Sequence, residues 1–286
     1  MTALTRIQAA RSARFYAGRV LMGFAMVAIV VFAGAPFVWM VLASLQPLPN
    51  LLGAQMDVFA FGDATIENYV RIVTEKGYLQ WFLNSMIVCA VVVGANLVFD
   101  SLIAYPLARM RFAGQKVVLL LVIAAIMIPA QVILVPLYVQ MRDLGWLDSY
   151  AALIAPYIVS PTGIFLLRQT FMSLPRELDE AAFIDGASRL RTLWSVLIPN
   201  SLAMYGTLAV LKFMWTWGEF AWPSLAINSA ELRTIPVGLA GLRSQFSTQW
   251  DLLMAGSVLA ILPVLLLFAF LQRYFVAGLT SGAVKG

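Results

Sequence analysis

The chain of 286 residues is 62% hydrophobic and only 12% charged, whereas roughly 25% of the residues in a soluble domain are charged. Its 19 Lys and Arg and 14 Asp and Glu are too few to cover a soluble protein of this length, so we expect lipid to be its main solvent. The sequence has no histidine, and its one cysteine, Cys89, lies in an apolar stretch. This composition excludes imidazole-based catalysis, disulfides and thiolate zinc sites, and no phosphate-binding loop motif is present. We therefore expect no metal or cofactor on this chain.

Six stretches can cross a bilayer as helices, because a spanning helix needs roughly 20 mainly apolar residues. They cover residues 20–44, 81–107, 117–140, 149–167, 200–222 and 252–274. The sequence thus predicts an all-α, polytopic membrane protein with a transmembrane domain over 20–275, an N-terminal segment at 1–19 and a C-terminal tail at 276–286. Prolines within the spans predict bends in the helix bundle.

The basic residues predict the orientation of these spans. The first span follows four arginines but is longer than the apolar region of a signal peptide, so we expect it to remain uncleaved. Thirteen Lys and Arg lie in segments on the N-terminal side of the membrane, five lie in segments on the other side, and Lys212 lies within a span. By the positive-inside rule, both termini are expected in the cytoplasm.

Two segments are expected outside the membrane. The first, 45–80, is long enough to fold on the membrane surface, and its part from Asp63 to Glu75 is predicted to be one short helix. The second, 223–250, is mostly polar.

The segment 168–199, between the fourth and fifth spans, carries helix signals. Ser173 is predicted to cap a short helix, Pro175 to occupy its first turn, and the acidic residues that follow favour the positive end of its dipole. Gly186 tolerates the left-handed conformation that ends a helix. A second helix is expected from about Ser188 to Pro199, with an apolar stripe of Leu190, Leu193, Trp194 and Leu197.

This segment carries a resemblance to a known family. Glu180-Ala-Ala-x-x-Asp-Gly-Ala, with Pro199 thirteen residues after Gly186, resembles the EAA motif in the membrane subunits of bacterial ATP-binding-cassette (ABC) importers. Further stretches are similar to the smaller permease subunit of maltose-type sugar importers: Phe82-Leu-Asn-Ser, Ala104-Tyr-Pro-Leu-Ala-Arg-x-Arg-Phe, Met127-Ile-Pro, Phe165-Leu-Leu-Arg-Gln, and the tail from Gln272 to Gly286. The resemblance covers nearly the whole chain.

The resemblance implies a type I ABC importer permease fold in a bacterial inner membrane. It also implies that the loop 168–199 carries a coupling helix that docks on an ATPase, through Glu177, Glu180, Ala181, Ala182, Asp185 and Gly186. The implied partners are a second homologous permease, two ATPase subunits or domains that bind ATP and Mg, and an external solute-binding protein. The chain itself is then a non-catalytic subunit for uptake of a sugar or a related polar solute. An amphipathic loop resting on lipid headgroups is the alternative interpretation of the same segment.

Polar residues inside the spans form a second candidate site. Asp100, Lys212 and Glu219 are costly in lipid and should face protein or water. Tyr205, Lys212 and Glu219 recur every seven residues and Thr216 lies one turn after Lys212, so these four share a helix face. We hypothesise that Asp100 and this stripe line a translocation path or contact the second permease, with packing inside the bundle as the alternative. The family usually has Trp-Asn before an acidic residue where this chain has Trp217-Gly218-Glu219, so no role of that asparagine carries over.

Two other function classes remain as alternatives. An ion-coupled secondary transporter would use Asp100 and Glu219 as carriers, but the internal repeat expected of such proteins is absent from the sequence. A membrane enzyme is disfavoured, because the sequence shows no cluster of nucleophile, base and metal ligands.

Overall fold

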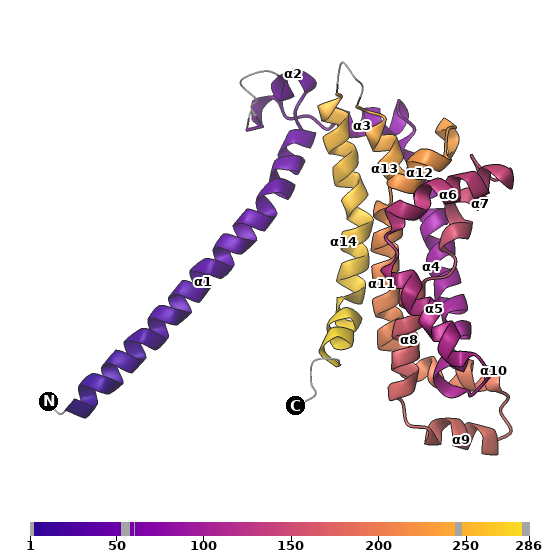
Figure 1. Ribbon diagram of the computed structural model, residues 1–286. Helices are drawn as coiled ribbons and strands as arrows, with labels where there is room; N and C mark the ends of the chain where they lie inside the picture. The colour runs from indigo at the N-terminus through magenta and orange to yellow at the C-terminus, as the bar shows by residue number, and fades with distance from the viewer. Residues whose placement is uncertain (1–2, 53–57, 60, 244–247, 282–286) are drawn as a thin grey trace. The chain divides into compact units, whose positions relative to one another are not determined.

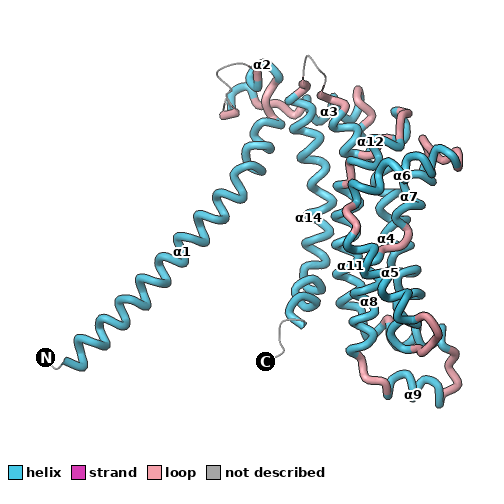
Figure 2. The backbone as a smooth tube through the Cα atoms, in the orientation of Figure 1, coloured by secondary structure: helices cyan, strands magenta, loops and turns pink. Residues whose placement is uncertain are grey.

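The computed structural model describes residues 3–52, 58–59, 61–243 and 248–281, and this part of the chain is mainly helical (Figures 1 and 2). It divides into two compact units, one formed by 1–72 with 248–258 and the other by 73–247 with 259–286. The remaining residues of the predicted C-terminal tail, 282–286, lie outside the described part.

The first unit contains α1 (Ala3–Ser44), α2 (Leu48–Leu51), most of α3 (Glu67–Thr74) and the first turns of α14 (Trp250–Ser281). Between Arg19 and Ser44, α1 is apolar along its length, and its most apolar window buries none of its residues inside the structure. A helix that exposes apolar side chains on every face must lie in lipid or against another chain.

The end of α1 is fixed by polar contacts. The side-chain amide of Asn68 donates hydrogen bonds to the backbone oxygens of Ser44 (2.9 Å) and Gln46 (2.8 Å). Arg71 forms an ion pair with the buried Asp251 (3.1 Å). The predicted helix from Asp63 to Glu75 is wrong at its start, because the backbone of Thr65 bonds to Leu45 and its hydroxyl caps Glu67, so α3 begins at Glu67.

The second unit is built around α4 (Tyr78–Arg109), which packs against α8 (Pro161–Ser173) and α11 (Leu202–Gly218). At 1.5 Å per residue, α4 is about 48 Å long and exceeds the thickness of the hydrocarbon core. Side chains such as Ala104, Leu167, Phe171 and Leu197 form the core between these helices. This core includes the C-terminal turns of α4 and of α8, and α8 is followed in the chain by α9 (Glu177–Ile184), which Figure 1 shows at the same end of the unit.

The predicted span 117–140 is broken. It consists of α5 (Gln115–Met127) and α6 (Ala130–Asp143), which meet at an angle of 103°. Pro129 has no backbone N–H and disfavours a helical conformation at the preceding residue, and Ile128 is accordingly extended (ψ 119°). A single straight helix is therefore the wrong description of this stretch.

The next two spans are also interrupted. Residues 150–173 form α7 (Tyr150–Ile154), a 3-10 turn and α8, with Ser160 capping α8 just before Pro161. The segment Arg189–Leu197 precedes Pro199–Gly218 with a bend of 43°. α11 ends at Gly218, not at residue 222 as predicted, and Ala221–Ala226 forms the separate helix α12.

Within the described part of the chain, four helices are long and apolar enough to cross a membrane, or up to six if each bent pair is one span. The larger of these two counts equals the number of predicted spans. The end of the second unit opposite α9 is formed by α12 and α13 (Ile235–Ala240), as Figure 1 shows.

Candidate functional site

The loop between α8 and α11 contains the predicted helix and turn. α9 runs over Glu177–Ile184, and Gly186 follows in the left-handed conformation with φ of 76°. The N–H of Gly186 bonds to the oxygen of Phe183 (3.0 Å) and that of Ala187 to the oxygen of Ala182 (2.9 Å). This pair of bonds is the Schellman motif that ends a helix and requires a residue at ease with positive φ. The predicted role of Gly186 as the end of the short helix is confirmed.

Two details of the loop differ from the prediction. Ser173 does not cap α9; it is the last residue of α8, and its hydroxyl donates to the backbone oxygen of Thr170 (2.8 Å). The second helix begins after Ser188, whose hydroxyl caps Arg191, but α10 (Arg189–Thr192) continues as one π turn at Leu193–Leu197. Leu193 and Leu197 of the predicted stripe are buried, whereas Leu190 and Trp194 are exposed.

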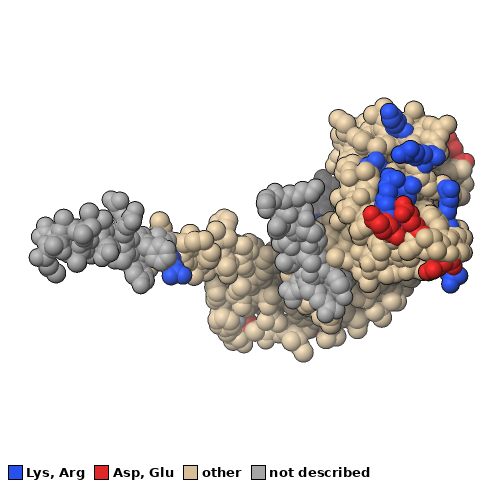
Figure 3. Space-filling model, turned by 90° about the horizontal axis from the view of Figure 1, so that it is seen from below, with Lys and Arg blue, Asp and Glu red and all other residues tan. Residues whose placement is uncertain are grey.

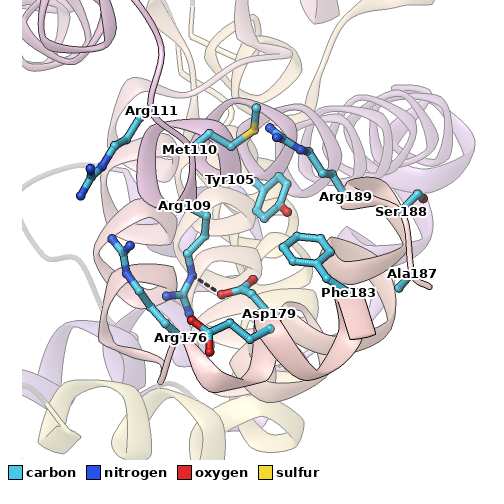
Figure 4. A pocket seen from close by; sticks show the side chains of 11 residues that line it. Tyr105, Arg109, Met110, Arg111, Arg176, Asp179, Phe183, Ala187, Ser188 and Arg189 are labelled. Carbon is cyan, nitrogen blue, oxygen red and sulfur yellow. Dashed lines mark ion pairs between the residues drawn. The ribbon is translucent and has the colours of Figure 1, made fainter. Parts of the chain in front are cut away.

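The inner face of α9 is anchored to the end of α4. Asp179 and Ala182, three residues apart and thus on one face, are the buried residues of this helix. The Nε atom of Arg109, at the last position of α4, lies 3.2 Å from a carboxylate oxygen of Asp179, and both side chains are buried (Figure 4). Arg109 also donates to the backbone oxygen of Leu174 in the segment before α9 (3.0 Å). A charged pair and a backbone contact therefore tie the short helix to the longest helix of this unit.

Burial raises the pKa of Asp179 above its usual value, although the charges of Arg109 and Arg176 lower it. Neither Arg109 nor Asp179 was among the site residues predicted from the sequence. A signal was present, because Arg109 belongs to the matched stretch Ala104–Phe112 and Asp179 lies between two predicted coupling residues. Helix periodicity alone did not distinguish this inward-facing acid from its outward-facing neighbours.

The outer face of α9 is open. Of the six residues predicted to contact an ATPase, Glu177, Glu180, Ala181, Asp185 and Gly186 are exposed, whereas Ala182 is turned into the chain. Ile184 is 86% exposed and was not selected from the sequence. Figure 3, which views this end of the second unit, shows basic and acidic side chains gathered on its surface. The face combines small, apolar and acidic residues without a covering element from its own unit.

The polar residues within the spans separate into different environments. Asp100, on α4, is buried and accepts a hydrogen bond from the backbone N–H of Ser160 (2.8 Å). Asn96, one turn earlier, donates to the backbone oxygen of Tyr157 (2.6 Å). Both side chains thus satisfy backbone groups released where the α7–α8 span is interrupted, as expected in a bilayer. Gly163 permits the approach, because a Cβ atom there would collide with the carboxylate of Asp100.

Asp100 and Lys212 line one cavity of about 590 Å³ between α4, α5, α6, α8 and α11. Asn96, Tyr157 and Trp215 also line it, and the ammonium of Lys212 lies 4.9 Å from the centre of the Trp215 ring. The rings of Tyr157 and Trp215 meet edge to face at 4.8 Å. The cavity therefore offers opposite charges, an amide and aromatic surface.

The other members of the predicted stripe are not in this cavity. The hydroxyl of Tyr205 bonds to that of Ser101 on α4, and Thr216 is buried with no hydrogen-bond partner for its hydroxyl among the described residues. Glu219 lies just beyond α11, where its carboxylate accepts from the backbone N–H of Trp222 (3.1 Å) at the start of α12. The seven-residue stripe is therefore wrong at Glu219, because α11 ends before it.

Glu219 instead lines a second cavity of about 590 Å³, together with Gln131 and Gln140 of α6. The two cavities share Tyr157 and Trp215 in their linings. Polar groups thus follow one another from Glu219 toward Lys212 and Asp100 along the bent α5–α6 pair.

Trp217-Gly218 stands where the family usually has Trp-Asn, and its tryptophan makes defined contacts within the unit. Trp217 is buried, stacks on Phe213 at 5.3 Å and donates to the backbone oxygen of Ala260 (2.9 Å). A Cβ atom at Gly218 would meet nothing within 4 Å. A Cβ atom therefore fits at position 218, and crowding around that atom does not require glycine.

At the other end of α4, Asn84 holds the segment that leads into α13. Its amide donates to the backbone oxygens of Glu231 (2.7 Å) and Arg233 (2.9 Å), and its carbonyl oxygen accepts from Tyr150 (2.6 Å) and Gln80 (3.0 Å). Ser85 accepts from the backbone N–H of Ile235 (2.9 Å). Asn84 and Ser85 belong to the matched stretch Phe82–Ser85, so a structural role accompanies that motif.

No group of three or more Cys, Asp or Glu that could hold a metal ion occurs among the described residues. The fold and the two candidate sites define a multi-pass helical membrane protein with an anchored helix and turn at one end of its bundle and polar cavities inside it.

Comparison with known proteins assigns the family. The model of the family described as "Binding-protein-dependent transport system inner membrane component" matches residues 100–281, which include the whole loop 168–199. The chain therefore belongs to this family of importer permease subunits, and the resemblance seen in the sequence is confirmed.

Its relatives include the arabinooligosaccharides transport system permease protein AraQ of Halalkalibacterium halodurans, which is 37% identical over 267 residues, covering 93% of this chain and 95% of that protein. The trehalose/maltose transport system permease protein MalG of Thermococcus litoralis is 32% identical over 275 residues, covering 94% and 97% of the two chains.

The fold is similar to a solved chain of a bacterial ABC transporter involved in the import of the acidic polysaccharide alginate. The TM-score is 0.81 at 22% identity, and the match covers 93% of this chain and 98% of that chain. This likeness confirms the predicted all-α permease fold.

Proposed function

We propose that this chain is the membrane-spanning permease subunit of an ATP-driven importer for a sugar or a related polar solute. It acts with a second homologous permease, two ATPase subunits or domains that bind ATP and Mg, and an external solute-binding protein. The chain performs no covalent chemistry, and ATP hydrolysis takes place on the partner ATPases.

The observation that carries this proposal is the arrangement of α9. Its inner face is tied to α4 by Asp179 and Arg109, while its outer face exposes Ala181, Ile184 and Asp185. An ATPase groove that receives the outer face can displace α9, and the anchored inner face passes that displacement to α4. A loop resting on lipid headgroups has no need of a buried ion pair to a spanning helix.

The excess of basic residues on the N-terminal side supports an orientation with both termini and α9 in the cytoplasm, where ATP is available. α12 and α13 then face the outside and the solute-binding protein. Alternating access follows when closure of the ATPases moves α9 and the bundle changes between inward-facing and outward-facing states.

The translocation path runs through the two adjoining cavities. Lys212, Asp100 and Asn96 can exchange hydrogen bonds with hydroxyl groups, and Trp215 and Tyr157 offer rings against which an apolar face of a sugar can pack. The relatives named above carry arabinooligosaccharides and trehalose or maltose in their names, which supports a saccharide as the solute.

Purification in a mild detergent tests the function. The chain should co-purify with an ATPase, and solute uptake into vesicles should stop when ATP is exhausted even if an ion gradient persists. Gly186→Pro should abolish uptake while the chain stays in the membrane, because proline cannot adopt the positive φ that ends α9. Uptake that follows an ion gradient without ATP would assign the chain to secondary transport instead.

The path has its own test. Lys212→Met and Glu219→Gln should each change the transport rate or the apparent substrate affinity, with ATPase association unaffected. Unchanged values for both variants would show that these residues only pack the bundle.

A further inference from the structure

A pocket of about 550 Å³ lies between the end of α4 and the loop that carries α9 and α10. Arginines from three places line it: Arg109 and Arg111 at the end of α4, Arg176 before α9, and Arg189 at the start of α10. Figure 4 shows Arg111 and Arg176 on one side of the pocket and Arg189 on another, with the Arg109–Asp179 pair between them.

The charges in this pocket do not balance. Its lining holds four arginines but only two carboxylates, Asp179 and Glu180. Asp179 is paired with Arg109, whereas Arg111, Arg176 and Arg189 form no salt bridge with any described residue. The lining therefore attracts an anion, and guanidinium groups suit phosphate because they can donate two parallel hydrogen bonds to it.

The pocket also contains buried polar atoms that make no hydrogen bond. The Nε atom of Arg109 and one carboxylate oxygen of Asp179 face each other in the ion pair described above without forming a hydrogen bond, and the other carboxylate oxygen has no partner among the described residues. All three atoms are inaccessible to solvent. Buried polar atoms in folded proteins nearly always have a partner, which can be a bound molecule or water. An occupant with both acceptor and donor groups, such as a phosphate with hydroxyl groups or ordered water, would satisfy them.

The position of the pocket relates it to the membrane surface. Arg111 comes two residues after the last residue of α4, where the spanning helix ends. In the orientation of the proposed function, on which this inference rests, that end faces the inner leaflet. Basic pockets at the cytoplasmic ends of spanning helices are suited to anionic headgroups.

We propose that this pocket binds the phosphate of an anionic ligand, of the kind carried by a phospholipid headgroup in the inner leaflet or by free phosphate. The bound phosphate bridges α4, the segment before α9 and α10. It holds α9 in a fixed position relative to α4. A displacement of α9 by the ATPase is then passed to α4 and the helix bundle instead of being taken up by movement of the loop.

A lipid titration tests the site on the complete complex. The transporter is reconstituted in nanodiscs of phosphatidylcholine with increasing phosphatidylglycerol, and ATP hydrolysis stimulated by the solute-binding protein is measured. Wild-type stimulation should rise with phosphatidylglycerol. Arg111→Gln combined with Arg189→Gln should need about 30-fold more of it, since each arginine near an anionic surface contributes roughly 1 kcal/mol.

Arg142→Gln is the matched control, because it removes an exposed arginine at the far end of α6 that pairs with its neighbour Asp143. It should respond as the wild type does. Arg176→Gln alone should weaken the response independently, and the melting temperature of each complex establishes that the variants are folded.

Inorganic phosphate added to discs of phosphatidylcholine alone distinguishes the sources. If it reproduces the stimulation, free phosphate occupies the site; if only phosphatidylglycerol acts, and native mass spectrometry finds it retained by the wild type but not by the double variant, the headgroup does. A double variant as responsive as the wild type, or a wild type indifferent to both anions, overturns the proposal. ATP-independent uptake by the same complex reconstituted in sealed vesicles would overturn the proposed function instead.

Discussion

The side chains of Arg109 and Asp179 form a buried contact whose loss we expect to matter more than that of an exposed charge. Asp179→Asn leaves the arginine buried and uncompensated, which typically costs about 3 kcal/mol or more. The variant complex should therefore melt at a lower temperature in nanodiscs and lose transport. Exchanging the two residues, Arg109→Asp with Asp179→Arg, should restore part of both losses. If the exchange is no better than either single variant, the pair does not anchor α9.

Asp148 gives a pH-dependent prediction at the turn between α6 and α7. It adopts a positive φ of 57°, and hydrogen bonds from Ser229, through its backbone and hydroxyl, and from the backbone of Asn228 lower its pKa. Because the pKa is lowered, the charged carboxylate of Asp148 contributes fully to stability at pH values above the usual pKa of aspartate. This contribution is lost as the pH falls through the lowered pKa.

The comparison is with Asp148→Asn, since asparagine also tolerates positive φ but has no charge. The wild type should melt at a higher temperature than this variant at pH 7, and the difference should shrink under acidic conditions. A difference that stays constant down to the lowest pH would show that the charge of Asp148 is irrelevant.

At the scale of the element, replacing each of two adjacent alanines of α9 by leucine should have different effects. Ala182 is buried in its own chain, so Ala182→Leu overfills the contact and should destabilise the permease by about 1–3 kcal/mol. Ala181 is exposed, so Ala181→Leu should leave the stability of the isolated chain almost unchanged and weaken only the co-purification of the ATPase. Melting of the chain alone and pull-down of the ATPase separate the two effects. Equal losses of stability would contradict the assignment of inner and outer faces.

The sequence predicted which segments are helical and where the Gly186 turn lies better than it predicted where the spanning helices break or end. Gly186 indicated the end of α9 because glycine readily adopts the left-handed conformation found at that position. The bend beside Pro129 was predicted, but not the sharp break at Ile128, because a bilayer span and a bent pair have the same composition. The end of α11 at Gly218 was missed. Prolines in the spans indicated bends but not their angles.

The candidate sites show the same difference between features that the sequence predicted and features that it did not. Asp100 and Lys212 were selected as costly charges, and they do line one cavity, but the hydrogen bond of Asp100 to Ser160 depends on a backbone interruption in another span. Arg109 and Asp179 are 70 positions apart in the sequence, so helix periodicity could not pair them. Local chemistry was predictable, whereas contacts between distant helices were not.

At the scale of the whole molecule, α4 makes the polar contacts found at both ends of the second unit. Asn84 and Ser85 hold the segment that enters α13, and Arg109 holds α9. Because the hydrogen bonds within a helix resist stretching and bending, a displacement at one end is carried along it to the other. This arrangement gives α4 the geometry of a direct connection between the two surfaces on which partners are proposed to dock.

The orientation of the molecule can be tested by cysteine labelling, because the only native cysteine, Cys89, is buried within α4. On a Cys89→Ser background, Asn228→Cys and Arg191→Cys place single exposed thiols at opposite ends of the second unit. A membrane-impermeant maleimide should label Asn228→Cys in right-side-out vesicles and Arg191→Cys only in inside-out vesicles, with the chain expressed without its ATPases. The Cys89→Ser chain itself supplies the blank. The reverse pattern would place α9 outside the cell, beyond the reach of ATP, and the coupling mechanism would then be wrong even though the fold is unchanged.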